Sequence, residues 1–280
     1  MKIIMIILSM CCFIGGFSTP TDTSINDSII AYLNGDAAKQ ESAINTEYNY
    51  SNEDELSSEE KNREANEKMF LIGQKIKAVN EDESLDEVAI TVNGCSITKR
   101  SIERMKILLG IEKLQAESID DEVSLREDIF KKIRDIVMET EAERQGIEGS
   151  QDEVDEYIEW LRKTNEKYSI DYTKKASENS ITENSFSDPI QAFYAGVELL
   201  SMDEYYSETA ESLYKASVRD NLWQSYREKY ENEIQREAEQ RNVSIADVEK
   251  EYRTNYEIEL IKRAKIEVLD PEVKEIISKR

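Results

Sequence analysis

The sequence of 280 residues contains no histidine. Histidine is the side chain that titrates nearest to neutral pH, and it is also the commonest protein ligand of metal ions. Its absence excludes Ser-His and Cys-His catalytic pairs, histidine-ligated zinc or iron, and acid–base chemistry by an imidazole. Much of familiar enzyme chemistry is therefore closed to this chain.

Cysteine is scarce as well. Of the three cysteines, Cys11 and Cys12 lie inside an apolar N-terminal run, which leaves Cys95 for the folded part of the chain. One thiol cannot form an internal disulfide or a cysteine zinc site. We predict no metal site and no cofactor, and we expect Cys95 to be a small buried hydrophobic residue near a turn.

Positive charge is in short supply. The chain has 36 Lys and Arg residues against 60 Asp and Glu residues, which gives a net charge of −24. Nucleic acids and anionic membrane surfaces both require clustered Lys and Arg. This balance argues against a nucleic-acid partner and against binding to an anionic membrane surface.

The N-terminal segment is predicted to be a targeting signal rather than part of the folded protein. After Lys2, an apolar run extends from Ile3 to Phe17, roughly 15 residues against the about 20 that a membrane span needs. Such a run is typical of a secretory signal peptide over residues 1–18, cut before Thr19. An uncleaved anchor is the alternative. Either predicts an extracytoplasmic protein, secreted or associated with the cell envelope, whose membrane contact is through this segment.

The rest of the chain divides by composition. Residues 19–56 are polar and weakly patterned, and we predict a disordered linker there, because they bury too little apolar area to offset backbone entropy. A helix start at Ser57 predicts an N-terminal helix and an acidic connector over residues 57–87. A helical domain is predicted over 88–270, and a C-terminal tail over 271–280.

Two short segments at opposite ends of this domain have strand character. In Val88–Gly94, VAITVNG, apolar residues alternate with other residues, and Asn93-Gly94 provides a tight turn. In Ala264–Pro271, AKIEVLDP, the alternation recurs before a proline that stops the strand. We predict that the two strands pair as a clasp that closes the helical domain.

Between the strands, apolar residues recur with helical spacing. Gly146 is predicted to end one helix and Ser244 to cap another, while Tyr168–Pro189 loses periodicity and is predicted to be a loop. The sequence predicts a mainly α fold, a multi-helix cradle with a small β clasp formed by the first and last strands of the domain. The predicted stripes are Ile102, Met105, Leu108 and Leu109; Ile129, Phe130, Ile133, Ile136 and Val137; Val154, Tyr157, Ile158 and Leu161; Leu222, Tyr226, Tyr230 and Ile234 on one long helix; and Val248, Tyr252, Tyr256 and Leu260.

The order of these parts resembles the SurA/PrsA-like chaperone family. VAITVNGCSITKRSIERM (88–105) resembles the opening strand and helix of its N-terminal domain, and RAKIEVLD (263–270) resembles the closing strand. EDIFKKIRDIVMETEAERQGI (127–147) with SQDEVDEYI (150–158), and GVELLSMDEYY (196–206), resemble segments between them. The resemblance covers roughly Val88 to Asp270. It implies an exported chaperone that holds unfolded or translocating chains, often beside a parvulin-type prolyl isomerase domain.

That isomerase domain is not expected in this chain. Tyr168–Pro189 is too short to hold another domain, and the histidines typical of a parvulin active site are absent. No phosphate-binding loop or nucleophile motif is present, and no pair of carboxylates stands out among the 60 acidic residues. We therefore predict no catalytic residue and no enzymatic activity.

The leading hypothesis is an ATP-independent holdase for unfolded or nascent exported polypeptides. Aromatic rings suit adaptable apolar contacts, and the negative charge would favour basic clients. The alternative is an extracytoplasmic scaffold that binds one fixed partner, with the Leu222–Ile234 stripe as a coiled-coil seam. Each aromatic side chain could equally be an ordinary residue of the hydrophobic core. The candidate client-binding residues lie around the central loop: Phe186, Phe193, Tyr194, Tyr205 and Tyr206.

Overall fold

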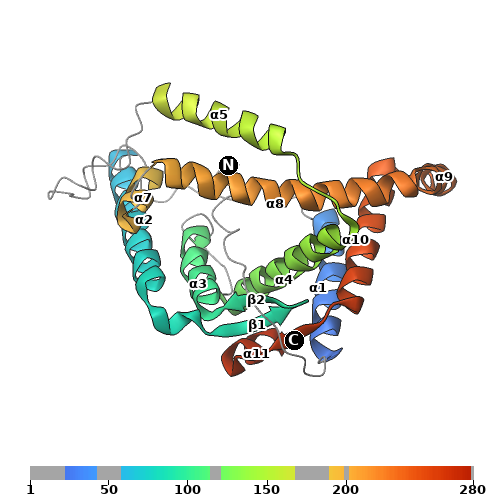
Figure 1. The fold of residues 1–280 in the computed structure, drawn as a ribbon, viewed down its shortest axis with the longest axis horizontal. Helices are drawn as coiled ribbons and strands as arrows, with labels where there is room; N and C mark the ends of the chain where they lie inside the picture. The colour runs from blue at the N-terminus through green and yellow to red at the C-terminus, as the bar shows by residue number, and fades with distance from the viewer. Residues whose placement is uncertain (1–22, 43–57, 114–120, 168–188, 199–201, 279–280) are drawn as a thin grey trace.

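The computed structural model describes residues 23–42, 58–113, 121–167, 189–198 and 202–278, and these residues are mainly helical (Figure 1). The predicted fold class, mainly α with a small β clasp, is confirmed. The described part contains no helix long and apolar enough to cross a bilayer. The helices are α1 (Thr23–Ser42), α2 (Ser58–Glu81), α3 (Lys99–Lys113), α4 (Asp121–Gln145), α5 (Gln151–Lys167), α7 (Pro189–Val197), α8 (Met202–Lys229), α9 (Glu231–Arg241), α10 (Ile245–Arg263) and α11 (Pro271–Ser278), with a 3-10 turn at Glu83–Asp86.

The clasp is a three-stranded antiparallel sheet in the order β2 (Cys95–Thr98), β1 (Val88–Val92), β3 (Ile266–Val268). Asn93 and Gly94 join β1 to β2 with φ of 51° and 89°, the left-handed values that a tight hairpin needs. Asn93 also donates its backbone N–H to the carbonyl of Lys265 at 2.8 Å. The predicted pairing of the two ends of the domain is confirmed. The segment after the turn, Cys95–Thr98, is a third strand.

The larger core surrounds this sheet and is mostly aliphatic. We call it the clasp core. The strands contribute side chains at 0% exposure to this core, on both sides of β1, and these join side chains of α4 and α10 in it: Ala89, Ile90, Val92, Ile97 and Ile266. Half-buried Cys95 packs against its edge. Its most enclosed side chains include Ile90, Ile97, Ile129, Ile133, Ile136 and Ile261.

Helix α1 belongs to the clasp core, so the prediction of a disordered linker over residues 19–56 is wrong for Thr23–Ser42. Ile25, Ile29 and Leu33 recur every four residues and are buried against the core. The side-chain amide of Asn26 donates to the carbonyls of Ile261 at 2.9 Å and of Ala264 at 3.2 Å, at the end of α10. The polar average of the whole stretch concealed this short stripe. Residues 43–57 lie outside the described part.

The predicted tail over 271–280 is likewise wrong for Pro271–Ser278, which forms α11. Pro271 does stop the strand, but it also occupies the first position of a helix, where its missing N–H costs nothing. The Asp270 carboxylate accepts hydrogen bonds from the backbone N–H groups of Glu272 and Val273. Val273 and Ile277 are then buried in the clasp core.

A second, smaller core lies at the other end of the molecule, where α2, α5, α7 and the beginning of α8 meet. We call it the aromatic core, because Phe193, Tyr194, Tyr205 and Tyr206 form much of it. Helices α2 and α7 approach each other so closely there that no side chain fits between them at Gly73 and Gly196. A Cβ at Gly73 would lie 2.2 Å from the carbonyl oxygen of Phe193. The two helices therefore pack backbone to backbone.

Helix α8 connects the two cores and runs across the molecule in Figure 1, between α5 and the sheet. Its first turns enter the aromatic core, and Leu222 and Trp223 near its end enter the clasp core. The predicted single helix through Leu222 and Ile234 is wrong, because α8 ends at Lys229 and α9 begins at Glu231. The stripe is buried against the chain's own helices at both Leu222 and Ile234, so it offers no continuous coiled-coil seam.

Two further helix ends agree with the sequence. The hydroxyl of Ser244 accepts the backbone N–H of Asp247 at 3.1 Å and so caps α10 as predicted. Gly146 has a φ of 69° and follows the last residue of α4, also as predicted. The predicted signal peptide lies outside the described residues, as does most of the predicted loop Tyr168–Pro189.

Candidate functional site

The structure brings four of the five predicted client-binding rings together in the aromatic core. Phe193 and Tyr194 come from α7, and Tyr205 and Tyr206 from α8. Their rings form a chain of contacts with centroid distances of 5.5, 5.1 and 5.4 Å. All four are buried, which is the plain reading that the sequence also allowed. The fifth ring, Phe186, lies outside the described residues.

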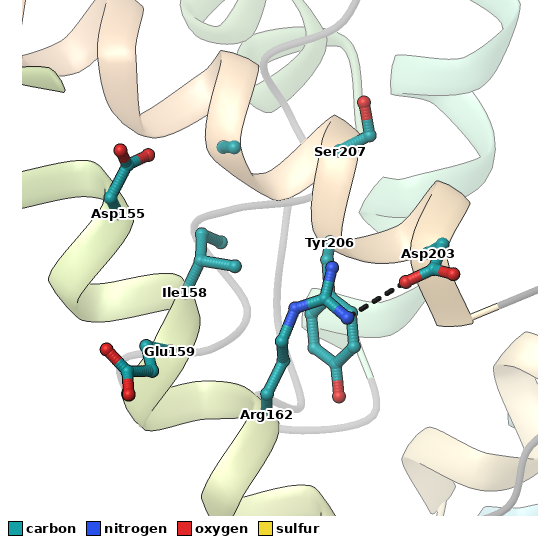
Figure 2. Close-up of a pocket in the computed structure, with 8 residues that line it drawn as sticks. Asp155, Ile158, Glu159, Arg162, Asp203, Tyr206 and Ser207 are labelled. Atoms are coloured by element: carbon teal, nitrogen blue, oxygen red, sulfur yellow. Dashed lines mark hydrogen bonds and ion pairs between the residues drawn. The ribbon is translucent and has the colours of Figure 1, made fainter.

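Of these rings, Tyr206 also lines a groove between α5 and α8. The groove has a volume of about 400 Å³. On each helix the lining residues recur at intervals of three and four, so a single face of each helix forms one wall. The lining residues are Asp155, Ile158, Glu159 and Arg162 of α5, and Asp203, Tyr206, Ser207 and Ala210 of α8 (Figure 2).

The floor of this groove is apolar and its edges are charged. Ile158, Tyr206 and Ala210 provide the apolar surface, with Ile158 and Tyr206 continuous with the aromatic core. Helix α5 is fixed to that core by Leu161, whose side chain is 5% exposed. Figure 1 shows α5 on the outer side of α8, away from the sheet. The groove therefore opens beside a helix that has packed neighbours on one side.

An arginine closes one end of the groove. Arg162 of α5 donates from Nη1 to the Oδ1 atom of Asp203 on α8 at 2.8 Å. Its guanidinium carbon lies 4.2 Å from the centre of the Tyr206 ring, so the cation sits over the ring face (Figure 2). Both geometries favour a positive charge at this position. The site is thus a small cation-binding corner beside an apolar floor.

Acidic residues dominate the groove. The lining includes three carboxylates, those of Asp155, Glu159 and Asp203, and one cation, Arg162. A hydrogen bond from Lys163 at 2.6 Å lowers the pKa of Glu159, so this carboxylate is ionised at neutral pH. The electrostatic field at the groove is therefore negative and attracts positively charged groups.

The sequence prediction missed one exposed aromatic side chain on α5. Trp160 is 55% exposed, and its ring lies 5.4 Å from that of Tyr157. The signal was present in the helical spacing. Val154, Ile158 and Leu161 define the inward stripe of α5, and Trp160 falls off that stripe.

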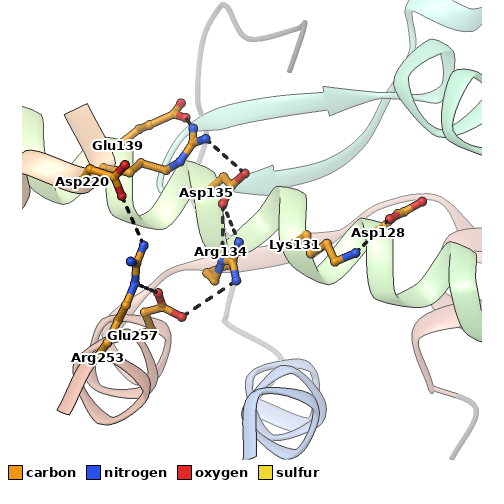
Figure 3. Close-up of polar contacts among 9 residues, drawn as sticks. Asp128, Lys131, Arg134, Asp135, Glu139, Asp220, Arg253 and Glu257 are labelled. Carbon is orange, nitrogen blue, oxygen red and sulfur yellow. Dashed lines mark hydrogen bonds and ion pairs between the residues drawn. The ribbon is translucent and has the colours of Figure 1, made fainter. Parts of the chain in front are cut away.

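A second cluster of charged residues joins α4, α8 and α10, and we weighed it as a site (Figure 3). Arg219 of α8 pairs with Glu139 and Asp135 of α4, and Arg253 of α10 pairs with Asp220 of α8. Burial raises the pKa of Glu139, against the opposing effect of Arg219. The charges are engaged with one another, which fits a role in holding three helices together.

Metal binding has no candidate in the described part of the chain, where no three His, Cys, Asp or Glu side chains are grouped so as to hold an ion. Comparison of the chain with protein-family models, curated proteins and solved structures gives no match. The resemblance to the SurA/PrsA-like family therefore rests on the sequence motifs alone and stays a prediction.

Proposed function

We propose that the protein is an ATP-independent holdase that acts outside the cytoplasmic membrane on unfolded or translocated polypeptides. The observation that carries the proposal is the groove between α5 and α8, with its apolar floor and its charged edges. The groove has a volume of about 400 Å³ and is open to solvent rather than an enclosed cavity, so it can take a client side chain without enclosing it. A client side chain can leave water there without any nucleotide-driven step.

The surroundings of the groove support reversible binding. The apolar floor is short, so each client contact buries little area and remains weak. Trp160 adds an exposed aromatic surface on the same helix. The net charge of −24 opposes association between copies of the protein and helps to keep a complex with an unfolded client in solution. The extracytoplasmic location rests on the apolar N-terminal run and on the family resemblance.

The test is light scattering from a chemically denatured client diluted into buffer with the purified protein. We expect suppressed aggregation at near-stoichiometric ratios for two unrelated clients. Ser207→Trp, which fills the groove, should abolish the suppression. Ser225→Trp makes the same change at another exposed position of α8 and should leave it intact.

Two results would contradict this proposal. The holdase activity is refuted if the unmodified protein protects neither client. The groove is refuted as its site if Ser207→Trp and Ser225→Trp protect equally well. Saturable binding of one partner, without protection of unrelated clients, would favour the fixed-partner scaffold instead.

A further inference from the structure

We propose that the groove selects client segments in which an Arg or Lys residue lies next to apolar residues, and that Arg162 occupies the cation position until such a client displaces it. This inference rests on the proposed holdase function and specifies the chemistry of its clients. The partner is a basic, apolar peptide segment. The corner formed by Asp203 and Tyr206 is the position that its cation takes.

The first support is the way in which Arg162 itself is held. Its guanidinium has an aromatic face on one side and a carboxylate oxygen in hydrogen-bond distance at its edge. These are the two interactions by which proteins recognise an arginine or lysine side chain of a ligand. Asp203 and Tyr206 both come from α8, while Arg162 comes from α5. One helix therefore provides a cation-binding corner, and the other provides its occupant.

The second support is that this occupant is weakly held. The side chain of Arg162 is 46% exposed and that of Asp203 is 82% exposed. An ion pair so open to water contributes little to stability, because solvent screens it and two side chains lose freedom. A client cation can take the same place at little cost. The released Arg162 turns into water, while buried Leu161 keeps α5 attached to the aromatic core.

The third support is the charge left behind by the exchange. Once Arg162 leaves the corner, the carboxylates of Asp155, Glu159 and Asp203 face the groove without a cation among its lining residues. Glu159 keeps its ion pair with Lys163, so a basic client compensates the charges of Asp155 and Asp203, whereas an acidic client is repelled by them. The apolar floor then takes the residue beside the client's cation. Ile158 and Ala210 lie on opposite walls of the groove, from α5 and α8.

The experiment compares two fluorescein-labelled nine-residue peptides by fluorescence anisotropy at low salt. Both contain the same Phe and Leu residues, and one carries two Arg residues where the other carries two Gln residues. We expect the Arg peptide to bind about fivefold more tightly, because exposed charge pairs give small but additive gains. In Arg162→Ala the corner is vacant, and the preference should rise about threefold further.

A matched pair of variants separates the corner from the general negative field. Asp203→Asn and Asp152→Asn each remove one carboxylate, from residues exposed near the beginning of α8 and of α5 respectively. Of these two residues, only Asp203 lines the groove. We expect Asp203→Asn to lose most of the preference for the Arg peptide and Asp152→Asn to keep it. Circular dichroism checks that each variant retains its helices.

The outcomes distinguish this inference from the function on which it rests. Equal affinity for both peptides, with aggregation still suppressed, overturns the selection of cations and leaves the holdase in place. Equal losses in Asp203→Asn and Asp152→Asn overturn the corner as the site. Weaker binding of the Arg peptide by Arg162→Ala overturns displacement. If neither peptide binds and no client is protected, both proposals fail together.

Discussion

The clasp core and the aromatic core differ in the side chains that form them and in whether they border a groove. Strand and helix side chains of the clasp core reach 0% exposure, and they come from the two ends of the described chain as well as from its middle. The rings of the aromatic core stay at 4–7% exposure, and one of them, Tyr206, faces a groove. The first core is closed on itself, and the second opens on a site.

This difference indicates which end of the molecule stabilises the fold and which end can adapt to a ligand. Branched aliphatic side chains interlock with little freedom and specify one arrangement. Aromatic rings offer large apolar faces that a neighbouring side chain can cover or leave. Stability therefore resides at the sheet, and binding is proposed at the far end, with α8 joining the two.

The largest expected effect comes from locking the clasp. Ile90 pairs with Val268 across β1 and β3. In a background with Cys11→Ser, Cys12→Ser and Cys95→Ser, which removes the three native thiols, Ile90→Cys with Val268→Cys should form a disulfide. Because the closed loop spans most of the chain, oxidation should raise the free energy of unfolding by about 4 kcal/mol. Urea unfolding of the oxidised and reduced forms measures this difference.

The control for the locked clasp is a mismatched pair. Ile90→Cys with Ile266→Cys places the thiols two positions out of register, because Ile266 pairs with Val92. Diagonal positions are about 7–8 Å apart, beyond the usual reach of a disulfide. No crosslink is expected in the folded protein. A crosslink in this pair and none in the other would contradict the register.

A smaller effect is expected from breaking the aromatic core at its tightest point. Gly73→Ala places a methyl group 2.2 Å from the carbonyl oxygen of Phe193, on the neighbouring helix. Helices α2 and α7 must separate, and we expect a loss of about 3 kcal/mol in unfolding free energy. Gln74→Ala, at the next and exposed position of α2, should change it by less than about 0.5 kcal/mol.

Gly73→Ala also tests how independent the two cores are. Hydrogen exchange should report faster exchange in α2 and α7, while β1 and β3 keep their protection. Uniform loss of protection throughout the chain would show instead that the two cores unfold as one unit.

The smallest expected effect is electrostatic and depends on pH. Burial alone would raise the pKa of Asp270, but the backbone N–H groups of Val273 and Glu272, with Lys99, donate to its carboxylate and lower the pKa below its ordinary 3.8. The ionised carboxylate therefore stabilises the folded state above pH 3.8, and this contribution is lost as the pH falls through the lowered value.

Asp270→Asn should accordingly cost about 0.5–1 kcal/mol at pH 7 and less at pH 2. Urea unfolding of both proteins at the two pH values measures this change. Asp203→Asn, at the exposed carboxylate of the groove, is the matched control and should be neutral at both. An equal cost of Asp270→Asn at pH 7 and pH 2 would rule out the charge as its cause.

Much of the clasp core followed from the sequence. The alternation in Val88–Val92, the Asn93-Gly94 turn and the second alternation near Ile266 were enough to predict a clasp between distant segments. What failed were two helices, α1 and α11, because their few buried apolar residues lie within polar surroundings. Their burial depends on a surface that exists only after the rest of the domain has folded.

The site was less predictable than the fold. Sequence spacing identified the four rings that meet in the aromatic core, but it gave no hint that Tyr206 alone among them would line a groove. The two residues that define the corner, Arg162 and Asp203, lie 41 positions apart in the chain. Such pairing depends on tertiary packing, because local periodicity carries no information on which helix faces which.

The two hydrogen bonds from Asn26 to the carbonyls of Ile261 and Ala264 bear on the order in which the chain can fold during synthesis. They join positions 235 and 238 residues apart, and β1 likewise pairs with β3 only after β3 has been made. Closing loops of this length is slow. A chain that emerges from its N-terminus cannot complete the clasp core until its last segments arrive. Until then the chain is in the same incompletely folded condition as the clients proposed for it.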